Sequence, residues 1–283
     1  MLYIIVSGAQ ETFEALSHFL FGGTMKEYKT NIELINYLIS KGLIINDKEN
    51  SLKNLERYSY YSIINGYKFV FKNNDNNYKE NTSFEEIFAL YEFDKNIKSI
   101  FLKYILEIEI IIKSLMSNTL AKQYGIQNYL NSSNFDDNIN KNSINIFIKK
   151  IEKEIDDNYI KHPAIKHYKD VYGFVPPFVL TKILTFGTIS KYYSLLKQYD
   201  RQTISKYFKL SDKLLKQILI NLTMVRNISA HSDRLFAYRN KYDISFKNIE
   251  KKYNEFRYLL YKEIEKLKEN LTVIDIKDIL IIM

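Results

Sequence analysis

Hydrophobic residues recur with helical spacing through most of this chain. The first clear run covers residues 32–39, with Thr30 before it as a candidate N-cap and Gly42 after it as a candidate stop. A second run covers residues 52–64 and ends near Gly66. Apolar side chains three and four positions apart line one face of a helix, so both runs predict amphipathic helices.

The longest predicted helix begins at a capping-box sequence, in which Ser83 is followed three residues later by Glu86. Its helical pattern continues to about Thr119. The run at residues 67–71 is β-prone, and the proline-containing stretch at residues 156–177 is expected to be irregular. A charged helix is expected to end at about residue 155. Further helices are expected over residues 178–186, 189–199, 211–230 (with Ser211 as the cap) and 246–270.

Turn-forming residues are scarce, with 8 Gly and 3 Pro among 283 residues. Sandwiches, propellers and βαβ proteins use such residues freely, so we expect an all-α fold built from many helices. Hydrophobic residues make up 46% and charged residues 26%, which is typical of a folded chain rather than a disordered one. The absence of Cys excludes disulfides, thiolate metal sites and cysteine nucleophiles.

Cationic residues outnumber anionic residues, and the net charge is +8. This excess of positive charge favours a polyanionic partner. The alternative is that it only makes the surface more soluble. The most apolar stretch, residues 97–115, carries charged side chains at intervals, so we expect no membrane span. No basic residue precedes the apolar N-terminal stretch, so we expect no secretory signal and a cytoplasmic protein.

Residues 1–24 differ from the rest, because they contain no Lys, Arg or Asn but three of the eight Gly. We expect these residues to be an atypical leader. It is either a tag, or upstream DNA translated ahead of Met25, or an additional native helix. The remaining chain is expected to form an N-terminal helical region, residues 25–125, and a second helical region, residues 126–283. One continuous domain over residues 25–283 is the alternative.

Common enzyme signatures are missing, since the chain has no Gly-rich phosphate loop, no GxSxG and no HExxH. By residue type His162 and His167 form a possible metal pair. However, Pro163 lies between them and no carboxylate cluster accompanies them. We therefore interpret them as surface-loop histidines, and we expect neither a metal site nor a cofactor.

The strongest candidate site is the sequence RNISAH at residues 226–231. On a helix Asn227 and His231 lie on one face, and the long side chain of Arg226 can reach around the axis. A histidine can move a proton to or from an RNA 2′-OH or a leaving oxygen, and a guanidinium can hold phosphate oxygens. One imidazole cannot be acid and base at once, so a second subunit is the simplest completion. A polar helix end without chemistry is the alternative.

Two more arginines, Arg234 and Arg239, follow closely. Lys is the usual cation in this chain, so each Arg is informative. We predict that both bind RNA phosphates, because a guanidinium can hold two phosphate oxygens together. The predicted catalytic residues are Arg226, Asn227 and His231.

Five blocks of sequence, in this order, resemble the Abi-like abortive-infection proteins, a branch of the HEPN superfamily. They are RYSYY with NGY at residues 57–67, TSFEEI with LYEFD at 82–94, EIEIIIKS at 107–114, PPF with LTFGTIS at 176–190, and RNISAH with RLF at 226–236. The resemblance extends from about Lys29 to Arg239 and leaves residues 1–24 outside. The chain departs from the family pattern at Ser232 in place of a second His, at Phe178 and Phe236 in place of Trp, and at Lys95, Lys98 and Lys113 in place of Arg.

The resemblance implies an HEPN-like helical region within residues 126–283. It also implies a homodimer in which two Arg…His motifs form a metal-independent endoribonuclease, and a toxin that arrests growth in phage defence. Some relatives are associated with a small non-coding RNA, so a cognate RNA is an expected partner, whereas the sequence identifies no antitoxin. Two other functions stay open, namely a non-catalytic binder of a structured RNA and a helical protein–protein adaptor in defence signalling.

Overall fold

The computed structural model describes residues 28–231, 233–238 and 254–272. Within these ranges the chain forms α-helices, short 3₁₀- and π-helices and isolated β-bridges, but no β-strand. The prediction of an all-α fold is therefore confirmed. The predictions for the leader at residues 1–24, for Ser232 and for Arg239 lie outside the described residues.

The described α-helices follow one another along the chain. They are α2 (Asn31–Ser40), α3 (Lys48–Tyr58), α4 (Phe84–Tyr124), α5 (Lys141–Asp157), α6 (Pro163–Tyr172), α7 (Pro177–Ile183), α8 (Phe186–Leu195), α9 (Gln198–Tyr207), α10 (Asp212–Ala230) and α11 (Asn254–Asn270). The short helices are the π-helix η1 (Tyr61–Asn65) and the 3₁₀-helices η2 (Lys68–Phe71) and η3 (Ser132–Asn134).

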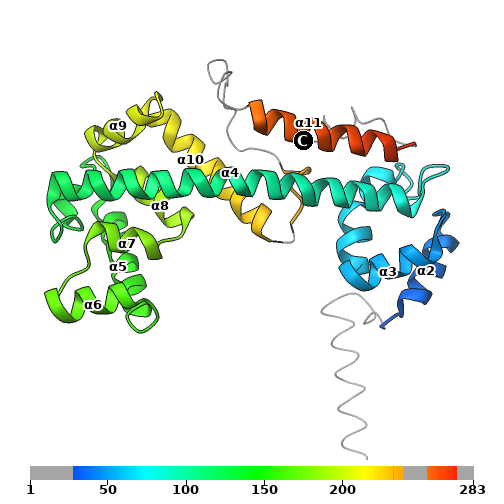
Figure 1. Ribbon diagram of the computed structural model, residues 1–283, viewed down its shortest axis with the longest axis horizontal. Helices are drawn as coiled ribbons and strands as arrows, with labels where there is room; N and C mark the ends of the chain where they lie inside the picture. Colours follow the sequence, from blue (N-terminus) through cyan, green and yellow to red (C-terminus); the bar gives the residue numbers. More distant parts are fainter. Residues whose placement is uncertain (1–27, 232, 239–253, 273–283) are drawn as a thin grey trace, which may run out of the picture.

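Helix α4 is the axis of the molecule, since its 41 residues make a rod about 60 Å long (Figure 1). Its first turn is held by the predicted capping box. The Ser83 hydroxyl accepts a hydrogen bond from the Glu86 N–H at 3.2 Å, and the Glu86 carboxylate accepts one from the Ser83 N–H at 3.1 Å. Gly125, at a positive φ of 77°, ends the helix. The predicted start is confirmed, and the helix continues past Thr119.

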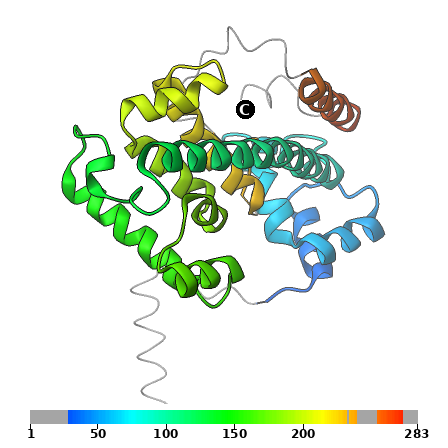
Figure 2. The same ribbon diagram turned by 60° about the vertical axis from the view of Figure 1, so that its left-hand side comes forward.

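Several of the other described helices pack along α4 (Figures 1 and 2). Helices α7, α8, α9 and α10 contact it, as does α11, which lies beside its N-terminal half. Several hydrogen bonds hold this half of α4 and the C-terminal part of the chain together, and two of them involve α11 and the chain just after it. Asn96 donates to Glu263 at 2.9 Å, and the Thr272 N–H donates to the Glu86 carboxylate at 2.6 Å. Helix α4 thus contacts elements before and after residue 125, and the predicted division at that point stays a prediction.

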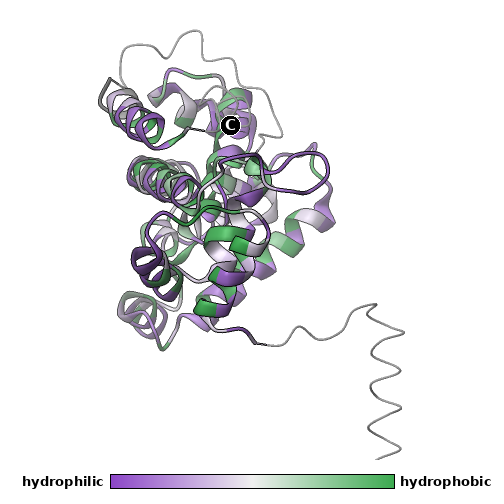
Figure 3. Ribbon diagram, turned by 90° about the vertical axis from the view of Figure 1, so that its right-hand side faces the viewer, coloured by the Kyte–Doolittle hydropathy of each residue, from purple (hydrophilic) through white to green (hydrophobic). Residues whose placement is uncertain are grey.

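Aromatic side chains fill much of the interior. Each described helix carries both hydrophobic and hydrophilic residues along its length, which is the amphipathic pattern expected around a shared core (Figure 3). The largest fully buried aromatic side chains are Tyr129, Tyr192, Tyr193, Phe71, Phe84, Phe135, Phe186 and Phe236.

Several local predictions were wrong. The β-prone run at residues 67–71 contains the 3₁₀-helix η2, because no neighbouring strand offers it backbone partners. The stretch expected to be irregular contains α6, because Pro163 occupies the first position of a helix, where its missing N–H costs nothing. The expected helix over residues 189–199 instead ends at Leu195, and α9 follows it.

Helix caps were predicted more reliably than helix ends. Thr30 and Ser211 both accept the N-terminal hydrogen bonds expected of N-caps, from Glu33 and Leu214 respectively. The helix expected over residues 52–64 is broken at Ser59, whose φ of 65° ends α3. None of the described helices combines the length and the apolar character needed to cross a bilayer.

Candidate functional site

His231 lies directly after the last residue of α10. Its backbone is extended, with φ −115° and ψ 179°, so it ends the helix rather than continuing it. Its N–H donates to the carbonyl oxygen of Asn227 at 3.1 Å, which caps the helix C-terminus. The side chain is exposed. The sequence predicts Asn227 and His231 on one helical face, whereas the structure joins them through a backbone hydrogen bond at the helix end.

His231 lines a surface pocket of about 240 Å³. Two lysines and several hydroxyl-bearing residues line this pocket together with His231. They come from α4, from α10 and from the segment before α4. The lining residues are Ser62, Tyr67, Tyr91, Lys95, Lys98, Ser99, Leu102, Ser229 and His231. Cations together with hydroxyl donors form a surface suited to a phosphate group.

The two lysines of the pocket differ in how firmly they are held. Lys98 donates to the carbonyl oxygen of Asp233 at 3.0 Å and lies 3.4 Å from the carboxylate of Asp94. Its side chain is only 12% exposed. Lys95 lies 3.3 Å from the carboxylate of Glu92, and 37% of its side chain is exposed. Lys98 is therefore a fixed part of the wall, while Lys95 can move toward an incoming anion.

Asp94 joins α4 to the segment that follows His231. Its fully buried carboxylate accepts hydrogen bonds from the Phe236 N–H at 2.7 Å, the Leu235 N–H at 3.3 Å and the Tyr67 hydroxyl at 2.8 Å. Burial, and after it the negative charge of Asp94, raise the pKa of Tyr67 above its usual value, so this phenol stays a donor. A buried carboxylate is tolerated only with such partners. Asp94 thereby fixes the segment that follows His231 against α4.

Arg234 is exposed but tied to the same region. Its guanidinium donates to the carbonyl oxygen of Gly66 at 2.7 Å and lies over the ring of Phe69, 5.2 Å from the ring centre. The ring of Phe236 stacks on those of Phe69 and Tyr67, at 5.7 and 5.3 Å between centres. The predicted RNA contact of Arg234 stays a prediction, since these interactions leave some of its five N–H groups for other partners.

The other predicted catalytic residues lie on α10 before the pocket. Arg226 is partly buried, and its Nε has no hydrogen-bond partner among the described residues. Asn227 is exposed. Of the described residues, those that line the pocket include neither Arg226 nor Asn227. Within one chain, the structure therefore brings His231 together with Lys95 and Lys98 of α4 rather than with Arg226.

Sequence reasoning missed several residues of this site, above all Asp94, Tyr67 and the α4 lysines. Asp94 and Tyr67 lie in the LYEFD and NGY blocks, so their order in the sequence was recognised but not their contact. Lys95 and Lys98 were noted only as departures from Arg. With 33 acidic and 41 cationic residues in the chain, no local signal marks out these few.

The two histidines considered as a metal pair lie on α6. His162 is the residue before its first position, and His167 lies inside it, where its ring contacts those of Tyr168 and Tyr172. His167 is exposed, but it is part of a helix rather than of a loop, because Pro163 starts the helix instead of breaking one. Among the described residues, no three His, Asp or Glu side chains are grouped as metal ligands.

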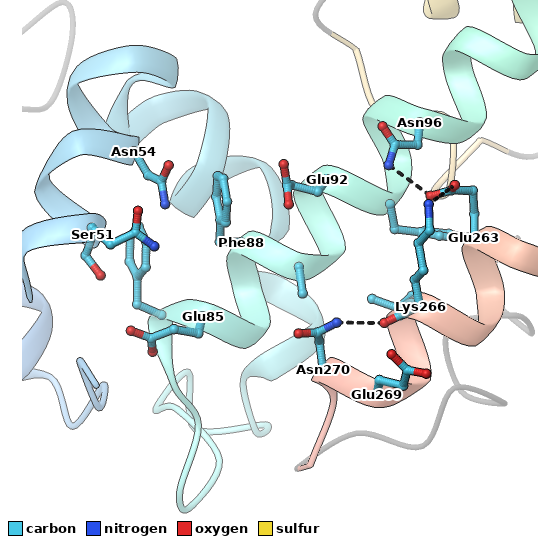
Figure 4. A pocket seen from close by; sticks show the side chains of 15 residues that line it. Ser51, Asn54, Glu85, Phe88, Glu92, Asn96, Glu263, Lys266, Glu269 and Asn270 are labelled. Atoms are coloured by element: carbon cyan, nitrogen blue, oxygen red, sulfur yellow. Dashed lines mark hydrogen bonds and ion pairs between the residues drawn. The ribbon is translucent and has the colours of Figure 1, made fainter. Parts of the chain in front are cut away.

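A larger pocket, of about 400 Å³, lies between α3, α4 and α11 (Figure 4). Among the described residues that line it, the charged ones are mainly acidic, with Glu85, Glu92, Glu263 and Glu269 against the cation Lys266. Glu263 already binds Asn96 and Lys266. Since the carboxylates would repel a phosphate, the pocket at His231 is the better candidate for an anionic ligand.

The comparison with protein families identifies one match. A family model described as "Abi-like protein" matches residues 53–237, which is more than half of the chain. The match includes every residue that lines the pocket at His231, as well as Asp94 and Phe236. Helix α11, which forms one wall of the larger pocket, lies outside it. No curated protein and no solved structure matches this chain.

Proposed function

Because this chain belongs to the Abi-like protein family, we propose that it acts in abortive infection as an RNA-binding protein that cuts RNA at the pocket of His231. One observation carries the proposal: an exposed imidazole lies beside two lysines and several hydroxyl groups in one pocket within the matched segment. The resemblance to HEPN ribonucleases supports the same chemistry, which needs no metal ion.

Cleavage of this kind forms one bond and breaks one. The 2′-oxygen of a ribose attacks the adjacent phosphorus, and the bond from phosphorus to the 5′-oxygen breaks. A base takes the 2′-OH proton, and an acid gives a proton to the leaving 5′-oxygen. In our proposal His231 fills one of these roles, because a histidine titrates near neutral pH.

The lysines would hold the phosphate while this happens. Negative charge grows on the non-bridging oxygens in the transition state, so cations set in place beforehand lower the barrier. Lys98 is held in place by Asp94 and the Asp233 carbonyl. Lys95, which is more exposed, would pair with the phosphate as it enters.

We further propose a homodimer, on chemical grounds. A single His231 cannot be both the base that takes one proton and the acid that gives the other. A second, identical copy of the chain supplies a second imidazole from its own His231. A guanidinium such as Arg226, which does not line the pocket of its own chain, would then serve in the shared site or in the contact between copies.

The second candidate function is a non-catalytic binder of a structured RNA. The observation that favours it is that only one imidazole lines the pocket, without Arg226. The two functions differ in the product. Incubating the purified protein with single-stranded RNA in the presence of a metal chelator should give fragments that end in a 2′,3′-cyclic phosphate. Binding of RNA without any cleavage would favour the second function.

A further inference from the structure

An exposed aromatic residue, Tyr61, is the sequence neighbour of a residue that lines the pocket of His231. Tyr61 is 77% exposed and directly precedes Ser62, which lines the pocket. Within the described residues its ring makes no aromatic or cation–π contact, unlike those of Tyr58 and Tyr67. A large aromatic side chain left open beside a polar pocket needs an explanation, because burial of such a ring is favourable.

The local backbone holds Tyr61 in this position. Ser59 adopts a φ of 65°, which breaks α3, and the π-helix η1 starts two residues later. Positive φ at a non-glycine residue and π-helices are both uncommon and often occur at functional sites. The next residues of η1, Ile63 and Ile64, are fully buried and anchor the turn. The backbone of Tyr61 is therefore held in place by the buried residues that follow it in η1.

A cation and a second exposed ring lie on the other side of Gly66. The carbonyl oxygen of Tyr61 and the Cδ of Arg234 each lie 4.0 Å from the position that a side chain on Gly66 would take. Arg234 in turn lies over Phe69, which is 44% exposed. The Tyr61 backbone and the Arg234 side chain, which covers Phe69, therefore both border Gly66, which lies in the sequence between the pocket-lining residues Ser62 and Tyr67.

We propose that Tyr61 stacks on the base of the nucleotide next to the phosphate held in the pocket, so that the ligand of this site is unpaired, single-stranded RNA. The inference rests on the proposed function, in which the RNA phosphate enters the pocket. Stacking on a side chain needs a free base face, which a base inside a duplex does not offer. Aromatic platforms beside a cationic groove are the usual means of binding single strands with little sequence preference.

The test compares RNA affinities of matched variants. Tyr61→Leu removes the ring and Tyr61→Phe keeps it, while Tyr199→Leu removes a tyrosine that is similarly exposed, at 67%, on α9. Fluorescence anisotropy would measure binding to a 2′-O-methyl single strand, which cannot be cleaved at its 2′-oxygens, and to a fully paired hairpin of the same chemistry. Thermal unfolding of each variant would check that the fold is kept.

The hairpin is closed by a non-nucleotide linker, so that it has no unpaired bases, and we expect the wild type to prefer the single strand. Tyr61→Leu should weaken that binding about 5- to 100-fold, with Tyr61→Phe and Tyr199→Leu close to wild type. Equal affinity of Tyr61→Leu and wild type for the single strand, or a preference of wild type for the hairpin, would overturn the inference and leave the proposed function standing. A wild type that binds neither RNA would instead overturn the proposed function and the inference with it.

Discussion

The carboxylate of Asp94, in the first quarter of the matched segment, accepts a 2.7 Å hydrogen bond from the backbone N–H of Phe236, 142 residues further along the chain. This contact fixes the segment that follows His231 against α4. The Lys98 side chain, beside it, binds the Asp233 carbonyl at 3.0 Å. The position of the imidazole thus depends on a buried carboxylate that does not itself line the pocket.

Asp94→Asn should destabilise the protein by about 3 kcal/mol. Breaking a buried charged pair leaves the partner charge without compensation, and the amide of Asn replaces one acceptor with a donor that faces other donors. Chemical denaturation would measure the loss. Glu92→Gln is the matched control, because the exposed Glu92–Lys95 pair should contribute less than about 1 kcal/mol. Equal stability of the two variants would contradict the anchoring role of Asp94.

Lys95→Gln should weaken RNA binding and reduce its dependence on salt. Each phosphate that a cation neutralises on a single strand adds about 0.7 to the slope of log affinity against log salt concentration, so one lost contact lowers the slope by about that amount. Lys206→Gln, on the exposed surface of α9, is the control. If both variants kept the wild-type slope, phosphate binding by Lys95 would be ruled out.

Asp136 should contribute to stability in a pH-dependent way. The hydrogen bond from Arg201, at 2.9 Å, lowers the pKa of Asp136 in the folded protein below its usual value of 3.8. A carboxyl with a depressed pKa stabilises the fold above its unfolded pKa, and the contribution disappears as the pH falls through the folded pKa. The difference in unfolding free energy between wild type and Asp136→Asn should therefore shrink below about pH 4.

The exposed Asp157 offers a control for this effect, since its carboxylate has no hydrogen-bond or ion-pair partner among the described residues. For Asp157→Asn, the difference from wild type should stay small at every pH. If the difference in unfolding free energy between wild type and Asp136→Asn stayed constant between neutral and acidic pH, the hydrogen bond from Arg201 would not lower the pKa of this carboxyl.

The protein should be a homodimer at micromolar concentration. The expectation follows from the need for a separate acid and base, which one His231 cannot supply. Light scattering coupled to size-exclusion chromatography measures the mass directly, with and without RNA. A monomer in both states that still cuts RNA would mean that another group of the same chain completes the site.

Much of the fold could be predicted from sequence because its signals are local. The capping residue Ser83, with Glu86 three positions on, marks the start of α4, and the scarcity of Gly and Pro indicates an all-α chain. The break at Ser59 could not be predicted, because Ser carries no sequence signal for a positive φ. The candidate site was predicted only in part, since His231 was identified while the contact of Asp94 with Phe236 depends on tertiary packing.

The central claim is that His231 transfers a proton during RNA cleavage, and its most direct test is the cleavage rate of single-stranded RNA in the presence of a metal chelator. His231→Ala should cut about 100- to 10,000-fold more slowly than wild type and still bind RNA. His167→Ala, which removes another exposed histidine on α6, should cut at the wild-type rate. A folded His231→Ala protein that cuts RNA as fast as wild type would contradict the account.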